Sequence, residues 1–98
     1  MDKKEQIINY YDNAIREMEN ILHAGITKEE TDRVNRDRWV LIYEYGRYLY
    51  NTGQIERAEE KFDVAIEITA DLIQKEKLSY LGNRYLKELM QRGDHYGD

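Results

Sequence analysis

The chain has 98 residues and no cysteine, and its 20 acidic and 15 basic residues give a formal net charge of −5 at pH 7. This composition excludes disulfides and thiolate metal sites, argues against a duplex nucleic-acid surface, which needs a dominant basic face, and contains no apolar run near the ~20 residues of a membrane span. We therefore expect one small cytoplasmic domain over residues 1–98, with neither a membrane nor a nucleic acid among its partners.

The first expected helix covers residues 3–23. Its apolar residues recur at three- and four-residue spacing, which is typical of an amphipathic helix. These residues are Ile7, Ile8, Tyr11, Ala14, Ile15, Met18, Ile21 and Leu22. Gly25 follows the helix and is well suited to end it in a left-handed conformation.

Three further helices are expected, and together they make the fold class all-α. They cover residues 28–50, 55–73 and 77–91. Thr27 and Glu30 have the spacing of a capping box at the start of the second helix. Gly53 is expected to end that helix.

The boundary between the third and fourth helices rests on a weak signal. Only a charged stretch interrupts the apolar pattern between Ile73 and Leu78. One continuous helix from Ile55 to Gln91, supporting a dimer, is therefore an alternative. Because such a helix would be far longer than the average of about 11 residues, we favour a break.

An internal repeat supports the broken interpretation. Residues 5–15 align with residues 56–66, with an aromatic residue, Asp, Ala and Ile coinciding, and Ile21 falls opposite Leu72. The first helix therefore has the character of the second half of a helical repeat.

The segment from Gly46 to Ala65 resembles the tetratricopeptide repeat. Gly46, Gly53, Ala58 and Ala65 supply its small residues, and Phe62 stands between the two alanines. The resemblance implies a right-handed solenoid or bundle of antiparallel helical hairpins, here with four helices. Gly46 would lie where the paired helices cross, and Ala58, Phe62 and Ala65 would pack back on the first helix of the pair.

A further match extends the resemblance towards the C-terminus. Residues 81–85, Leu-Gly-Asn-Arg-Tyr, match the opening of another repeat, and the chain ends before the second helix of that repeat. The resemblance therefore implies one full repeat flanked by two half repeats. Either the chain closes this unit itself, or a second copy completes it. The pattern departs from the family at Tyr45, where leucine is usual, and at Leu49, where tyrosine is usual.

The resemblance also implies a partner-binding surface on the first helices of successive repeats. That surface maps to Val40, Tyr43, Glu44, Arg47, Tyr50 and Asn51, continued by Ser79, Tyr80, Asn83, Leu86 and Lys87. Tyrosines give rigid contact area, and Arg47 could grip a carboxylate with two parallel hydrogen bonds. The alternative is that Tyr43 and Tyr50 pack on the first helix of the chain and that Arg47 is solvated.

Catalytic residues, cofactor sites and metal sites are not predicted. His23 and His95 are isolated, and no phosphate-binding or metal-binding motif appears. We expect a non-enzymatic protein–protein interaction module that binds a peptide or helix through a tyrosine-rich groove. The alternatives are a small acidic inhibitor that blocks a basic site on a nucleic-acid enzyme, alone or as a homodimer, and a protein whose main role is self-association.

Overall fold

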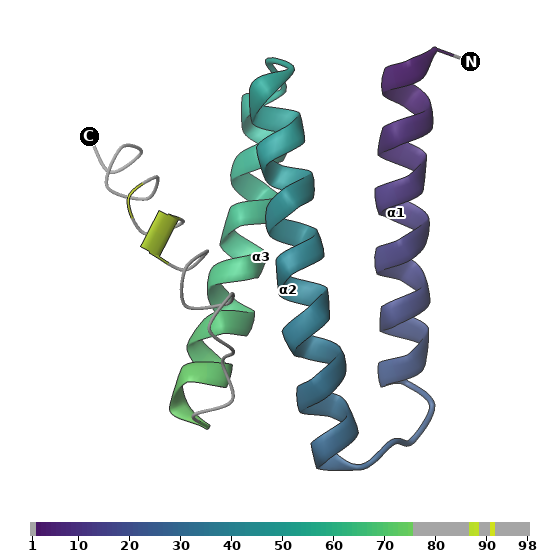
Figure 1. Cartoon of the computed structure of the whole chain (residues 1–98), viewed down its shortest axis with the longest axis vertical. Coiled ribbons are helices and arrows are strands. Elements are labelled where there is room, and N and C mark those ends of the chain that lie inside the picture. Colours follow the sequence, from purple (N-terminus) through teal and green to yellow (C-terminus); the bar gives the residue numbers. More distant parts are fainter. Residues whose placement is uncertain (1, 76–86, 89–90, 92–98) are drawn as a thin grey trace.

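Three helices make up most of the described chain. A computed structural model describes residues 2–75 and residues 87, 88 and 91, and its helices are α1 over Lys3–Leu22, α2 over Lys28–Asn51 and α3 over Ile55–Gln74 (Figure 1). The all-α class is confirmed for these residues, and each helix begins and ends within one residue of its expected range. The expected fourth helix over 77–91 lies for the most part outside the described residues.

α2 is the central helix of the three. It lies between α1 and α3 and packs on both, and the chain reverses direction at each connection (Figure 1). The connections are short, over residues 23–27 and 52–54, and short connections favour antiparallel neighbours. α2 therefore needs apolar side chains on two faces, one towards each neighbouring helix.

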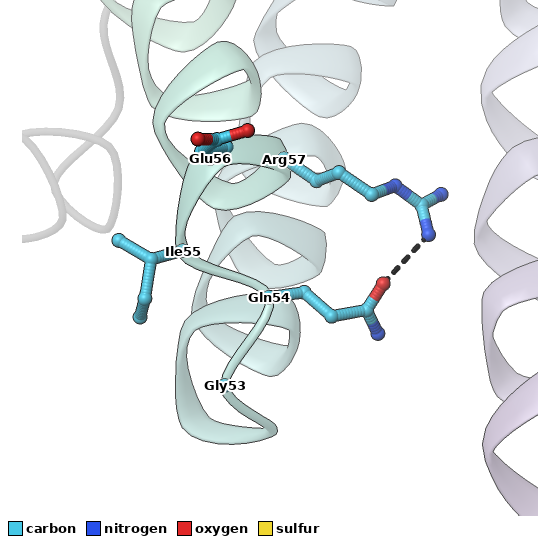
Figure 2. Close-up of a pocket in the computed structure, with 5 residues that line it drawn as sticks. All are labelled: Gly53, Gln54, Ile55, Glu56 and Arg57. Carbon is cyan, nitrogen blue, oxygen red and sulfur yellow. Dashed lines mark hydrogen bonds between the residues drawn. The ribbon is translucent and has the colours of Figure 1, made fainter.

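The turn between α2 and α3 is built on Gly53. Its φ of 87° is a left-handed conformation that glycine adopts without strain. Gly53 N donates to Tyr50 O at 3.1 Å and Gln54 N donates to Leu49 O at 2.9 Å, which are the two bonds of a Schellman cap. Arg57 Nη1 donates to Gln54 Oε1 at 2.8 Å across the same turn (Figure 2). The expected helix stop at Gly53 is confirmed.

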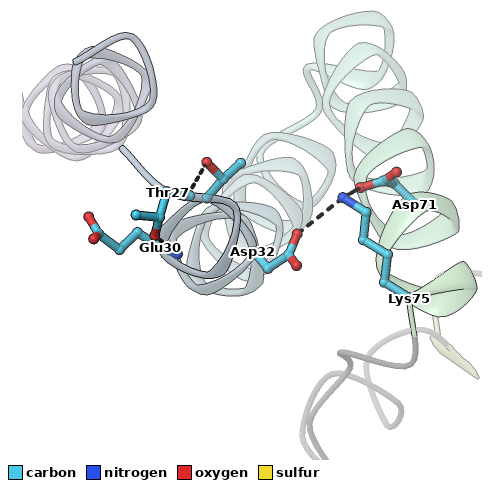
Figure 3. Close-up of polar contacts among 6 residues, drawn as sticks. Thr27, Glu30, Asp32, Asp71 and Lys75 are labelled. Atoms are coloured by element: carbon cyan, nitrogen blue, oxygen red, sulfur yellow. Dashed lines mark hydrogen bonds and ion pairs between the residues drawn. The ribbon is translucent and has the colours of Figure 1, made fainter. Parts of the chain in front are cut away.

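Polar contacts fix the start of α2 and link it to the end of α3 (Figure 3). Thr27 Oγ1 accepts a hydrogen bond from Glu30 N at 3.2 Å, as the capping-box spacing predicts. Lys75 Nζ lies 3.2 Å from Asp32 Oδ1 and 3.0 Å from Asp71 Oδ2. Asp71 and then Asp32 raise the pKa of Lys75 through these contacts. Lys75 is also the C-cap of α3, so α3 ends here and does not run on as one long helix.

α2 and α3 approach each other closely at Gly46. A Cβ atom on Gly46 would lie 2.7 Å from Cε1 and 2.9 Å from Cδ1 of Phe62, so a residue without a side chain is required at this spacing. Phe62 is buried, and so are Ala58 and Ala65, about one turn to either side of it. The predicted packing of Ala58, Phe62 and Ala65 against the preceding helix is therefore confirmed.

Aromatic side chains fill much of the core between α2 and α3. The ring centroid of Tyr43 lies 5.7 Å from that of Phe62 and 6.4 Å from that of Trp39, distances at which aromatic rings attract one another. Leu49 and Leu72 are fully buried in the same cluster. Burial of each large apolar side chain contributes roughly 1.5–3 kcal/mol. The α2–α3 hairpin therefore holds most of the stabilising apolar contact.

α1 differs from α3 in having no buried residue. It contacts the core through the partly buried side chains of Ile8, Tyr11 and Ile15. Ile21 of α1 aligns in sequence with Leu72 of α3, yet Leu72 is fully buried whereas Ile21 is 48% exposed. The two helices match in sequence but not in burial, because α2 covers this position on α3 and no described helix covers it on α1.

Replacing Gly46 by alanine tests the close helix crossing. In an open helix this change would add about 0.5–1 kcal/mol of stability. Here the new methyl group would overlap Phe62, so we expect a net loss of about 1–3 kcal/mol in the free energy of unfolding, measured by urea denaturation.

The same Gly46→Ala change in a Phe62→Leu background provides the control. Leucine removes the ring atoms that overlap, so the cost of the alanine should be smaller there. A stabilising effect of Gly46→Ala in the wild-type chain would show that the helices are not held at this distance.

Candidate functional site

Only some of the residues expected to form a groove on α2 are accessible to solvent. Four of its residues are half buried and one is exposed: Val40, Glu44, Arg47 and Tyr50, and then Asn51. Lys87 is exposed, while Ser79, Tyr80, Asn83 and Leu86 lie outside the described residues. The structure therefore brings together a row of accessible side chains along α2, from which Tyr43 is missing.

Tyr43 belongs to the core. Its exposed fraction is 0%, and its ring contacts Trp39 and Phe62. The sequence assigned Tyr43 to a partner-facing surface because the first helix of a repeat usually presents this position. The structure corrects that placement, since the large Phe62 ring of α3 meets α2 at this level. The alternative that Tyr43 packs inside the protein is right about its burial, and the ring contacts Phe62 of α3.

Arg47 is an accessible charged group of the row, in which Glu44 is the other. Its guanidinium carbon lies 5.9 Å from the ring centroid of Tyr43, within the range of a cation–π contact. Arg47 Nη2 lies 3.8 Å from Glu88 Oε1, and both side chains are somewhat more than one-third exposed. Glu88 directly follows Lys87, so this ion pair brings the two segments of the expected surface next to each other. Arg47 thus already meets a carboxylate, the group that the sequence predicted it to bind.

A buried phenol joins the three helices on the other side of α2. The Tyr45 hydroxyl accepts a hydrogen bond from Arg57 Nη2 at 3.2 Å, and its ring stacks on Tyr11 of α1 with the centroids 5.0 Å apart and the planes 5° apart. Lys61 Nζ lies 5.3 Å from the ring centroid of Tyr45. Burial, with a further contribution from Asp12, raises the pKa of Tyr45 to about 12, against an opposing effect of Arg57.

The sequence did not predict this junction. In the repeat register Tyr45 replaces a leucine, which indicates a large buried side chain but not the hydroxyl contacts. Asp12 and Arg57 stand on different helices, and only the packing of both helices on α2 brings them to the same phenol. The signal that could have predicted this junction is the hydroxyl of Tyr45, at a position where the repeat usually has an apolar side chain.

The turn between α2 and α3 contains a depression of about 290 Å³ that is open to solvent (Figure 2). It is lined by five consecutive residues: Gly53, Gln54, Ile55, Glu56 and Arg57. Small-molecule sites are usually concave and mostly enclosed by apolar side chains. A depression formed by one turn alone lacks that enclosure, so the geometry does not favour a small-molecule site here.

α3 carries an acidic surface beside an exposed apolar one. All six carboxylates of the helix are exposed: Glu56, Glu59, Glu60, Asp63, Glu67 and Asp71. At 3.6 residues per turn they fall on roughly a third of the helix circumference. Next to them lie Ile55, Ile66 and Ile73, which are 39%, 42% and 47% exposed. Such a surface has the chemistry to receive a basic, amphipathic segment.

The described residues contain no group of three or more side chains that could hold a metal ion, and no helix among them is long and apolar enough to cross a membrane. His23 is exposed just after α1, and His95 lies outside the described residues. Comparisons with known proteins gave no match to a family model, to a curated protein or to a solved structure. The candidate site is therefore defined by its side chains alone.

The raised pKa of Tyr45 predicts a loss of stability at high pH. The ordinary pKa of tyrosine is 10.0 and that of Tyr45 in the folded chain is about 12, so the folded state holds the phenol proton more tightly than the unfolded state. This contribution is complete below pH 10 and is lost as the pH rises towards 12. Over that interval the free energy of unfolding of the wild type should fall more steeply than that of Tyr45→Phe, by up to about 1.4 kcal/mol per pH unit.

Urea denaturation of both chains between pH 9 and pH 12 checks this prediction, because the lysines titrate similarly in the two. Curves that stay parallel across the interval would show that the Tyr45 hydroxyl has an ordinary pKa.

Proposed function

We propose that this protein is a non-enzymatic interaction module of the tetratricopeptide-repeat type, acting in the cytoplasm and binding a peptide or a helix of a partner protein. The observation that carries the proposal is the close crossing of α2 and α3 at Gly46 and Phe62, flanked by buried Ala58 and Ala65. Such hairpins stack into a right-handed solenoid, in which the segment 77–91 would form the first helix of the next repeat.

The partner-binding surface in this proposal is the accessible row on α2 together with Lys87. Arg47 is its anchor, because the ring of Tyr43 beneath it limits where the guanidinium can lie and leaves its outer side accessible. A carboxylate of the partner would replace Glu88 and form charge-assisted hydrogen bonds with Arg47. The rigid helix keeps the ordering cost of binding low.

Selection of peptides from a random library displayed on phage, using the immobilised full chain, tests this proposal. We expect enriched peptides that share an acidic residue or a free C-terminal carboxylate beside apolar residues. Arg47→Ala should weaken their binding about tenfold or more, because a hydrogen bond to a charged group contributes about 1.5–3 kcal/mol. Arg33→Ala is the matched control, since Arg33 is an exposed arginine on the same helix.

A second variant separates an anchoring role from a structural one. Glu88→Gln removes the carboxylate that competes for Arg47 and should therefore tighten binding of the selected peptides. Failure to enrich any shared peptide, or equal losses with Arg47→Ala and Arg33→Ala, would contradict the proposed surface.

The acidic surface of α3 favours a second candidate function, that of an inhibitor that covers a basic site on another protein. Its six exposed carboxylates lie on one side of the helix beside three exposed isoleucines. Binding of this kind should weaken steeply with salt, because exposed charges are screened within about 10 Å at 0.1 M. Binding at the α2 row, which combines one arginine and one glutamate with apolar contacts, should depend on salt much less.

An amphipathic helical peptide of lysine and leucine serves as a probe for this second candidate. We expect it to bind the wild type, and binding should fall strongly with added salt and in the variant Glu59→Gln/Asp63→Asn/Glu67→Gln. The control Glu5→Gln/Glu17→Gln/Glu29→Gln removes three exposed carboxylates elsewhere. Fluorescence anisotropy of the labelled peptide measures both, and equal losses in the two variants would contradict a specific role for α3.

A further inference from the structure

Beside the side of α1 that packs on α2 lies an apolar strip, in which Ile7, Ala14 and Met18 are half buried. Its members are Ile7, Tyr10, Ala14, Met18 and Ile21. At 3.6 residues per turn they fall within roughly a quarter of the helix circumference, and the strip is about 21 Å long at 1.5 Å per residue. Tyr10 is 66% exposed, more than any other large apolar side chain among the described residues, and Ile21 is 48% exposed. We call these five residues the α1 strip.

The corresponding side of α3 shows what this kind of helix usually packs against. In the alignment of the internal repeat, four of the five buried residues of α3 match members of the α1 strip. The pairs are Ala58 with Ile7, Ala65 with Ala14, Thr69 with Met18, and Leu72 with Ile21. On α3 this side is covered by α2, whereas α1 buries none of its residues. The α1 strip therefore has the sequence of a packed helix face without the helix that would cover it.

The α1 strip has a spacing that is symmetric about its centre, with a large side chain opposite a large one. About its centre at Ala14, Ile7 is the counterpart of Ile21, and Tyr10 is the counterpart of Met18. In a two-fold interface residue i of one copy contacts residue j of the other and j contacts i, so a strip of this symmetry can pair with itself. In an antiparallel pair of α1 helices, isoleucine would meet isoleucine and tyrosine would meet the methionine thioether, a favourable contact. The small Ala14 would lie where the two helices cross, as Gly46 does between α2 and α3.

Charge argues against an ionic partner for the strip and suits a second copy. The strip itself has no charged residue, and the residues on its outer edge are Gln6, Asn13, Glu17 and Asn20. Amide side chains donate and accept hydrogen bonds, so they can pair with the same surface of another copy. α1 has three basic and four acidic residues, whereas α3 has two basic and six acidic ones. Two acidic chains repel each other less through α1 than through α3.

We propose that the α1 strip is a self-association surface, occupied by the same strip of a second copy of this chain running antiparallel to it. The contact is apolar at its centre, with Ala14 of each copy on the two-fold axis. At its edge, the Asn13 amide of one copy lies within reach of the Glu17 carboxylate of the other. The α1 strip is thereby covered by a second helix, as the corresponding side of α3 is covered by α2.

Sedimentation equilibrium of the full chain tests this proposal with a matched pair of variants. The wild type should show a dimer with twice the monomer mass of 11.8 kDa, and salt should not weaken the dimer, since an apolar contact is not screened. Ile21→Glu places a charge in the contact and should raise the dissociation constant about tenfold or more. Ile73→Glu should leave the constant unchanged.

The two variants are closely matched. Ile21 and Ile73 are each the second-last residue of their helix, and their exposed fractions are 48% and 47%. A wild type that remains monomeric at about 1 mM would overturn the proposal. So would equal effects of the two substitutions on association. Unfolding of Ile21→Glu at a clearly lower temperature than Ile73→Glu, with association unchanged, would show that the strip is covered within its own chain and would overturn it as well.

Cysteine cross-linking tests the direction of the pair, because the native chain has no cysteine. Ala14→Cys places a thiol on the two-fold axis and should form a disulfide-linked dimer under mild oxidation. Tyr10→Cys places two thiols about 12 Å apart along the helices of an antiparallel pair and should not form one. Cross-linking at both positions would indicate a parallel pair and overturn the antiparallel arrangement, and cross-linking at neither would overturn the contact.

Discussion

The contact between Gly46 and Phe62 sets the distance between α2 and α3, and the rest of the described structure depends on it. At this spacing the Phe62 ring reaches α2, and Tyr43 and Trp39 close around the same region. Because Tyr43 is thereby drawn into the core, Arg47 lies above its ring with its guanidinium partly accessible on the row on α2. A wider crossing would remove the core contact and the support of Arg47 together.

α2 carries two kinds of contact on its two sides. Towards α3 it is apolar and closely packed, while towards α1 it relies on the stacked pair Tyr45 and Tyr11 and on the partly buried Ile8 and Ile15. Stacked rings fix direction more strongly than aliphatic contact does. This difference accounts for a helix α1 that is held in place by α2 without any residue being buried.

Local signals in the sequence predicted the helices and the crossing, but not which tyrosines form the surface. Thr27 and Gly53 make hydrogen bonds with backbone groups a few residues away, so their spacing alone was sufficient to place them. Gly46 and Phe62 are complementary in size, and the repeat spacing was sufficient to place them too. Tyr43 and Tyr45 are only two residues apart, and a tyrosine suits a core as well as a wet surface. Their roles depend on the rotation of α2 against two neighbours. The repeat alignment likewise placed Ile21 and Leu72 at the same repeat position. Only the helices that neighbour them make Ile21 exposed and Leu72 buried.

The surfaces of the three helices are chemically distinct, and this separation affects what the protein can do at one time. The α1 strip is uncharged, the row on α2 centres on a single arginine, and the outer side of α3 is acidic. An antiparallel pair formed through α1 would therefore cover neither of the other two surfaces. It would present two copies of the Arg47 row on one particle. A partner with two binding segments would then be held far more tightly than by either row alone, because the second contact forms within the same complex.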